Sequence, residues 1–144
     1  MARWISADLR QAIADRAQFL CESCLIAEAD AFYGCEVDHI ISLKHGGSSE
    51  QDNLAYACAL CNRAKGSVIG SVSTTGEFTR FFNPRTDRWA EHFRLEQAVI
   101  RPLTTVGEVT ARILAFNDSA RLHEREEMIR FGNYPSEAAS AIMV

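Results

Sequence analysis

The pattern of apolar and polar positions predicts a helix near the start of the chain. The apolar side chains of residues 6–20 recur at helical spacing, at Leu9, Ile13, Ala17 and Leu20. Ser6 stands where an N-cap is expected, and Asp8 falls in the first turn, where a carboxylate favours the positive end of the helix dipole. The sequence therefore predicts a helix over residues 6–20.

Short strands and loops are predicted in the next part of the chain. Residues 36–41 predict a strand that is short or bulged, because their apolar positions alternate poorly. A glycine- and serine-rich loop at 45–49 separates it from a second short strand at 54–57. One or two helical turns follow from Cys61 and end at Gly66.

The second half of the chain predicts a hairpin and then helices. Residues 68–82 form the hairpin, with a turn at 74–76. We expect a helical extension over 86–131, with helices that begin near Asp87, Thr105 and Ser119. Thr105 and Glu108 have the spacing of a capping box. We expect residues 136–144 to form a loose or lightly docked tail.

Length and composition are those of an ordinary globular protein. The 144 residues suffice for one domain, and 47% of them are hydrophobic and 24% charged. No apolar run approaches the length of a membrane span, and the chain does not start with an apolar leader, so we expect a cytoplasmic protein with no membrane partner. The net charge of -4 argues against a protein that coats nucleic acid through bulk positive charge.

Charge is unevenly distributed along the chain. Acidic residues are in excess before residue 37, whereas residues 63–101 are predominantly basic. The basic side chains of that segment are Arg63, Lys65, Arg80, Arg85, Arg88, Arg94 and Arg101. They exceed the acidic ones there, which are Glu77, Asp87, Glu91 and Glu96. If the protein binds DNA, we expect contacts in this segment.

Cysteine spacing predicts a zinc site. Two pairs with two residues between the cysteines, Cys21 with Cys24 and Cys58 with Cys61, can complete a tetrahedral thiolate shell. Such a filled shell is structural, because it leaves no position for a substrate. The alternative is four buried cysteines without metal. Cys35 has no partner at metal spacing and is expected to be a buried thiol.

A second cluster of residues has the chemistry of phosphodiester hydrolysis. His39 can act as a base near neutral pH, and the oxygens of Asp38 and Asn62 suit Mg²⁺ or Mn²⁺. Because successive strand residues point to opposite sides, we expect Asp38 to bind the metal and His39 to act on water. Structural alternatives are a turn residue at Asp38, a structural histidine at His39, an Asx-turn at Asn53 and an N-cap at Asn62.

These motifs together resemble the HNH endonuclease family, in its branch with a four-cysteine zinc site. The resemblance covers residues 21–66 and includes Val37-Asp38-His39-Ile40-Ile41, Gly46-Gly47, Asn53-Leu54, Asn62 and Lys65-Gly66 besides the four cysteines. It implies an α+β fold with a ββα-metal core, in which two strands and a helix hold one catalytic cation.

The resemblance also implies residue roles. His39 matches the general base, and Asp38 and Asn62 match the ligands of the cation. Asn53 matches the residue that holds the loop and aligns the His39 ring. Asn62 stands where many members have histidine, which makes this an H-N-N variant and favours Mg²⁺ or Mn²⁺ there.

DNA is the expected substrate. Lys65 matches a position that is often basic in the family and could contact phosphate, and Arg63, Arg85 and Arg88 are further candidates. No base-reading element is apparent, so we expect duplex DNA to be cut with weak sequence preference. Two alternatives remain, namely a non-catalytic zinc module that binds nucleic acid or protein, and a nuclease that acts on RNA. The sequence does not define the oligomeric state.

Overall fold

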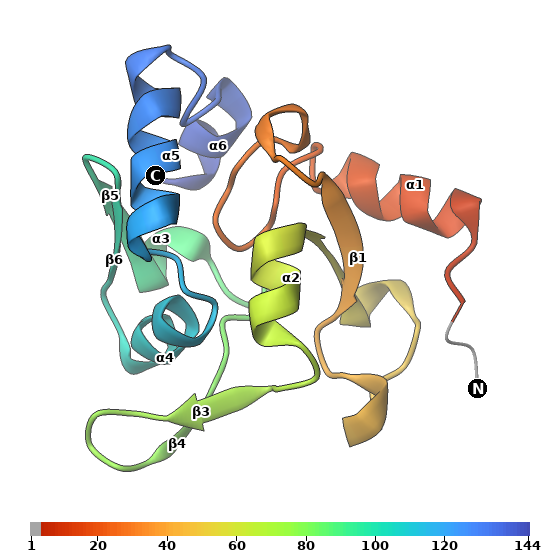
Figure 1. The fold of residues 1–144 in the computed structure, drawn as a ribbon. Coiled ribbons are helices and arrows are strands. Elements are labelled where there is room, and N and C mark those ends of the chain that lie inside the picture. Colours follow the sequence, from red (N-terminus) through yellow and green to blue (C-terminus); the bar gives the residue numbers. More distant parts are fainter. Residues whose placement is uncertain (1–3) are drawn as a thin grey trace.

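The computed structural model describes residues 4–144; residues 1–3, on which part of the expectation of no leader rests, lie outside this range. Figure 1 shows the helices and strands around a central hairpin and helix. In chain order they are α1 (Ala7–Arg16), β1 (Cys35–His39), β2 (Leu54–Cys58), α2 (Ala59–Lys65), β3 (Gly70–Val72), β4 (Phe78–Arg80), α3 (Trp89–His92), β5 (Phe93–Glu96), β6 (Val99–Pro102), α4 (Thr105–Ile113), α5 (Ser119–Arg130) and α6 (Glu137–Ile142). Short 3-10 turns lie at Glu28–Asp30, Leu43–His45 and Gln51–Asn53. This mixed architecture confirms the predicted α+β class.

The centre of the molecule is an antiparallel hairpin followed directly by a helix. β1 pairs with β2, with His39 at the end of β1 opposite Leu54 at the start of β2. α2 then runs back alongside β1 (Figure 1), and the amide of its first residue, Ala59, donates to the carbonyl of Gly34 at 3.1 Å. Two strands and a helix therefore form the predicted ββα unit.

The first helix is shorter than predicted. The Ser6 side chain caps α1 as expected, but the helix ends at Arg16 rather than at residue 20. The backbone then turns through Phe19, which has a φ of +58°. This turn places Leu20 in a β-bridge with Ala27, where Leu20 is buried. A tertiary pairing has replaced the last turn of the helix.

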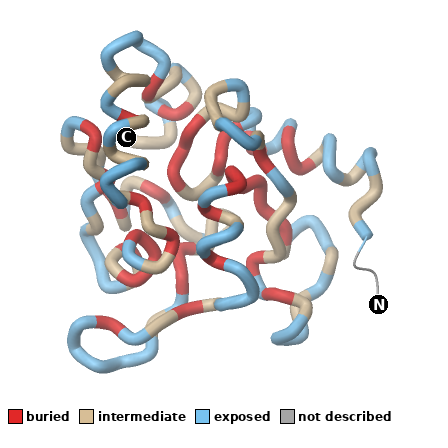
Figure 2. Tube along the Cα trace, in the orientation of Figure 1, coloured by how far each residue is buried: buried red, intermediate tan, exposed pale blue. Residues whose placement is uncertain are grey.

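The hairpin predicted over 68–82 is present with short strands. β3 pairs with β4, and Val72 lies opposite Phe78. A Cβ at Gly70 would lie 2.4 Å from the carbonyl oxygen of Thr79, so this close strand approach requires glycine. Figure 2 shows that most of this hairpin is exposed.

A third hairpin interrupts the extension that was predicted to be helical over 86–131. β5 and β6 pair around a tight turn, in which Gln97 has a φ of +55°. The helix predicted to begin near Asp87 is present as α3, but it ends at His92, and Phe93 begins a strand. The cap of α4 is Thr104, one residue before the predicted one. The tail predicted to be loose contains α6, whose Ala139 is fully buried.

One cluster of buried side chains extends from Ile13 in α1 to Ala139 in α6 and includes the four knuckle cysteines. Its largest fully buried members are Phe93 and Phe116, whose rings pack 5.6 Å apart. The C-terminal helices thus share a core with the ββα unit. Among residues 4–144, no helix has the length and apolarity needed to cross a membrane.

Asp87 connects the β3–β4 hairpin to the segment that follows it. Its carboxylate accepts two hydrogen bonds from Arg80, at 2.7 and 3.1 Å, and one from the amide of Asn83 at 2.8 Å. Burial alone would raise the pKa of Asp87, but these donors more than offset it and hold the pKa below its usual value. A carboxyl with a lowered folded-state pKa stabilises the fold above its unfolded pKa and loses this contribution as the pH falls through the folded value.

We therefore expect Asp87→Asn to lower the free energy of unfolding at pH 7 by about 1–2 kcal/mol. The deficit should begin to shrink at pH 3, because this pH lies below the ordinary aspartate pKa of about 3.9 and the stabilisation is lost as the pH falls from there through the lower folded-state pKa. Urea unfolding of both proteins at pH 7, 5 and 3 measures it. A deficit that is the same at all three values would contradict this role of the carboxylate.

Candidate active site and zinc centre

The four knuckle cysteines converge in the core. Their sulfur atoms all lie within 4.8 Å of one another, and the Cys24 and Cys58 sulfurs are 3.8 Å apart. Zinc–sulfur bonds of about 2.3 Å give a tetrahedral edge of about 3.8 Å, so zinc fits this cluster. The amides of Cys24 and Cys61 approach the sulfurs of Cys21 and Cys58 at 3.5 Å, as expected for knuckles that stabilise thiolates.

Local backbone structure presents the two knuckles to each other. The first follows the bridge at Leu20 and ends with Leu25, at a φ of +65°. The second is the junction of β2 and α2, where the Cys58 sulfur caps the helix by accepting from the Cys61 amide. Hydrogen bonds from the other three thiols lower the pKa of Cys24 well below its usual value, so this thiol ionises readily.

Cys35 takes no part in this centre. It is 3% exposed, and burial raises the pKa of its thiol to about 12. The prediction of a buried, inert thiol is confirmed.

The side chain of Asp38 is largely buried, and its partner is Lys65. The Lys65 Nζ lies 3.1 Å from both carboxylate oxygens and donates to the carbonyl of His39 at 2.9 Å. Only 11% of the Asp38 side chain and 9% of that of Lys65 are exposed. Burial raises the pKa of Asp38, and the Lys65 ammonium partly offsets this. In this structure Lys65 is the counter-charge of Asp38, and its possible contact to phosphate stays a prediction.

Asn62 lies one turn before Lys65 on α2, so the two side chains project toward the same side of the helix. Its possible role as an N-cap is wrong, because α2 begins at Ala59 with Cys58 as its cap. Asn62 is half-buried, and within residues 4–144 its side-chain amide makes no hydrogen bond. Asp38 and Asn62 thus offer hard oxygen donors beside one end of α2.

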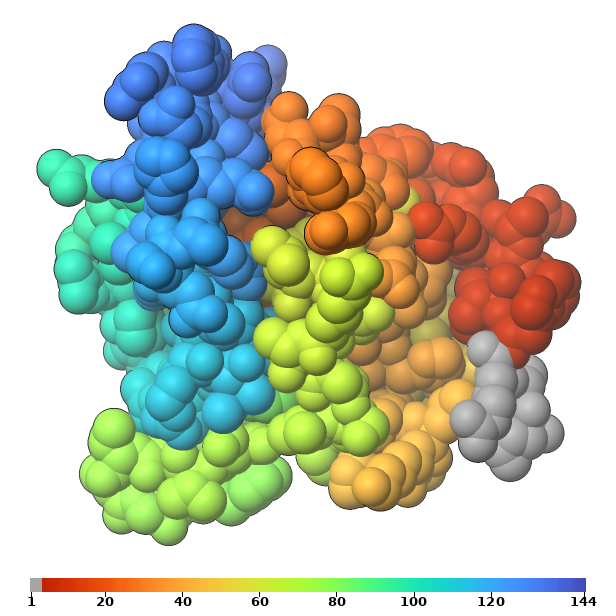
Figure 3. Space-filling view, viewed as in Figure 1, coloured from red at the N-terminus to blue at the C-terminus, as the bar shows by residue number. Residues whose placement is uncertain are grey.

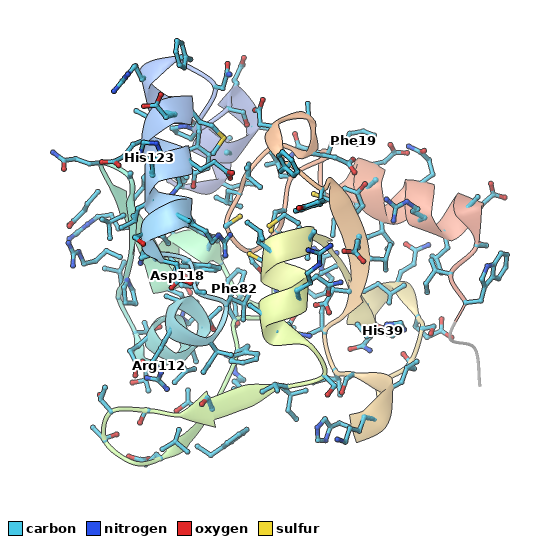
Figure 4. The ribbon with its side chains drawn as sticks, viewed as in Figure 1. Phe19, His39, Phe82, Arg112, Asp118 and His123 are labelled. Atoms are coloured by element: carbon cyan, nitrogen blue, oxygen red, sulfur yellow. The ribbon has the colours of Figure 1, made fainter. Side chains whose placement is uncertain are left out.

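The ring of His39 is fixed by the loop that follows β1. Its Nε2 lies 3.0 Å from the Ser49 hydroxyl, and within the described part of the chain Nδ1 has no hydrogen-bond partner. Figure 4 shows His39 beside this loop, well away from His123 on α5. Ser49 was not singled out in the sequence, where it is one of two adjacent loop serines.

Asn53 holds that loop closed. Its oxygen accepts the Ile41 amide at 2.9 Å, and its Nδ2 donates to the carbonyls of Ile41 at 2.9 Å and Ser48 at 2.7 Å. A Cβ at Gly47 would lie 1.7 Å from the Ile41 oxygen, which explains the glycine there. Among residues 4–144, no hydrogen bond joins Asn53 to the His39 ring. Asn53 instead fixes Ser48, and the neighbouring Ser49 contacts the ring.

Asp38 and His39 face different surroundings, as strand alternation predicts. Asp38 and Lys65 line a cavity of about 70 Å³ beside Phe81 and Pro84, and neither His39 nor Asn62 lines it. Asp38 and His39 are linked instead through Lys65, which contacts the Asp38 side chain and the His39 backbone.

Most of the basic segment is neutralised within the fold. Arg85 pairs with Glu22, Arg88 with Glu91, and the others with neighbouring acids, in the pairs Lys65–Asp38, Arg80–Asp87, Arg94–Glu96 and Arg101–Glu96. Among the described basic residues of this segment, Arg63 alone lacks an acidic partner; its guanidinium lies 4.8 Å from the centre of the Tyr33 ring. DNA contacts by Arg63, Arg85 and Arg88 stay predictions.

Comparison with known protein families gave a match to this region. Residues 21–67 match the family model described as HNH endonuclease, and this segment contains the four cysteines of the cluster. The matched family is thus one of nucleases. Comparisons with curated proteins and with solved structures gave no significant match.

Zinc removal should unfold the protein, because the thiolates join segments that are distant in sequence. We expect about one zinc per chain in the purified protein and loss of the far-ultraviolet circular dichroism signal with strong chelators. Elemental analysis and chelator titration measure this. A chain that stays folded without metal would show the cysteines to be ordinary core residues.

The buried Asp38–Lys65 pair should be strongly coupled. Asp38→Asn alone leaves the ammonium uncompensated and should cost about 3–5 kcal/mol of stability. The double variant Asp38→Asn/Lys65→Met should recover most of that loss. Urea unfolding of the wild type, both single variants and the double variant gives the coupling. Simple additivity of the two single losses would argue against this pairing.

Proposed function

We propose that this protein is a divalent-metal-dependent endonuclease that hydrolyses phosphodiester bonds of DNA. The main observation in support is an imidazole, held through Nε2 with Nδ1 open, directly after a buried carboxylate in a segment that matches HNH endonucleases. The donor set around it favours Mg²⁺ or Mn²⁺ over zinc.

Asp38 and Asn62 are the residues proposed to hold the cation. The ammonium of Lys65 lies 3.1 Å from both oxygens of the Asp38 carboxylate, so a bound cation would take the place of the ammonium at one of these oxygens. When bound there, a divalent cation supplies electrostatic stabilisation of the charge that develops on the phosphate and on the leaving 3'-oxygen.

His39 is the proposed general base. With Nε2 hydrogen-bonded to Ser49, Nδ1 is the nitrogen that accepts a proton from the attacking water. Ser49 fixes the plane of the ring, and Asn53 fixes the loop that carries Ser49. The products expected from the family resemblance are a 5'-phosphate and a 3'-hydroxyl.

Nicking of supercoiled plasmid in Mg²⁺ or Mn²⁺ tests this function. We expect His39→Ala to lower the rate at least ~100-fold, since general base catalysis contributes about 10²–10⁴-fold. The melting temperature should stay near that of the wild type. His45→Ala is the matched control, because His45 is an exposed histidine of the same loop.

The result also separates the alternatives. An intact plasmid with wild-type protein would favour a zinc module that binds nucleic acid or protein without cleaving it. Faster cleavage of RNA than of duplex DNA in direct competition would redirect the proposal to RNA. Cleavage that survives in His39→Ala would remove His39 from the mechanism.

A further inference from the structure

A half-buried arginine from the C-terminal extension, Arg121, lies against the four knuckle cysteines. Arg121 Nη2 is 3.2 Å from the Cys61 sulfur and 3.9 Å from the Cys58 sulfur. Arg121 belongs to α5, which runs beside α2 on the face shown in Figure 3. Arg121 lies far outside residues 21–67, so it is not part of the match to the HNH family model.

The charge of the centre explains why a cation is placed there. Four thiolates around Zn²⁺ leave a net charge of about -2. A charge buried without a partner is costly, and a guanidinium that donates to sulfur reduces this cost. The neighbouring Arg125 does not have this role, because its guanidinium donates to the carbonyls of Ala98 and Phe116.

The second terminal nitrogen of the Arg121 guanidinium is held by the backbone that follows α4. Its Nη1 donates to the carbonyls of Leu114 at 2.8 Å and Ala115 at 3.4 Å, just beyond that helix. Its guanidinium also lies 5.9 Å from the centre of the Phe116 ring. One side chain therefore links the thiolates, the end of α4 and the start of α5.

Two further contacts tie the extension to the first knuckle. Tyr134 donates its hydroxyl to the carbonyl of Cys24 at 2.8 Å, and Trp89 donates its indole N–H to the carbonyl of Ser23 at 2.8 Å. A cavity of about 170 Å³ adjoins Cys24, Cys58 and Arg121, so the thiolate centre can be reached beside the arginine.

We propose that Arg121 is the resident counter-charge of the zinc–thiolate centre, that it slows zinc release, and that it makes the packing of α4 and α5 depend on bound zinc. Arg121 is a positioning residue for the metal centre. This inference does not depend on nuclease activity, and its test uses none.

The first test measures zinc release from the full zinc-loaded chain to a chromogenic chelator. We expect Arg121→Met to release zinc at least ~10-fold faster, and Arg121→Lys to lie between Arg121→Met and the wild type, because lysine keeps the charge without the fork of donors. Arg130→Met is the matched control, since Arg130 is an exposed arginine of the same helix, paired with Glu127. Equal release from wild type and Arg121→Met would overturn the proposal.

Cobalt substitution distinguishes a direct role from a general loss of packing. A hydrogen bond to sulfur lowers the energy of its lone pairs, so the thiolate-to-cobalt absorption bands should shift to longer wavelength in Arg121→Met and partly return in Arg121→Lys. Unchanged bands in Arg121→Met would overturn the proposal. If Arg121→Met does not fold, Arg121→Lys decides: release within a few-fold of wild type supports the proposal, and release as fast as from urea-unfolded wild type overturns it.

Discussion

The rest of the structure depends on the convergence of four cysteine sulfurs, which connects a loop after α1 to the junction of β2 and α2. One cysteine pair precedes the hairpin in sequence, and the other lies where the hairpin passes into α2. The geometry of the four thiolates therefore fixes where α2 starts and how it lies against β1. The small sheets have only two strands each, and such ribbons are marginal by themselves. Metal binding therefore supplies a constraint that the hydrogen bonds of the hairpin cannot.

A second electrostatic constraint lies at the other end of α2. Lys65 satisfies the buried carboxylate of Asp38, so the carboxylate can remain ionised without a metal. The pairing also affects how variants are read. A substitution at Asp38 removes both a proposed metal ligand and the partner of a buried ammonium, so lost activity alone would not identify its cause. His39 is a cleaner probe, because its ring is held by a single hydroxyl contact.

Features set by local spacing could be predicted from the sequence, and features set by long-range pairing could not. The knuckles and the β3–β4 hairpin follow from residue types a few positions apart, whereas the ββα unit was predicted from the family resemblance. The end predicted for α1 was wrong because Leu20 pairs across a turn with Ala27. The β5–β6 hairpin was missed because its strands have four residues each and Gln97, rather than glycine, takes the positive φ in its turn. The partners of Lys65 and Arg121 lie tens of residues away and carry no local signal.

The two proposed metal sites share one short helix. The cysteines Cys58 and Cys61 lie at the start of α2, and Asn62 and Lys65 lie in its remaining turn. A helix of seven residues is not stable by itself in water, so its position is set by its contacts. At the start these are the thiolates with Arg121, and at the end the ion pair with Asp38. Loss of zinc would release the first set of contacts and leave the second to hold the helix alone. A metal that is closed to substrate can in this way determine how α2, which carries Asn62, lies relative to Asp38 on β1.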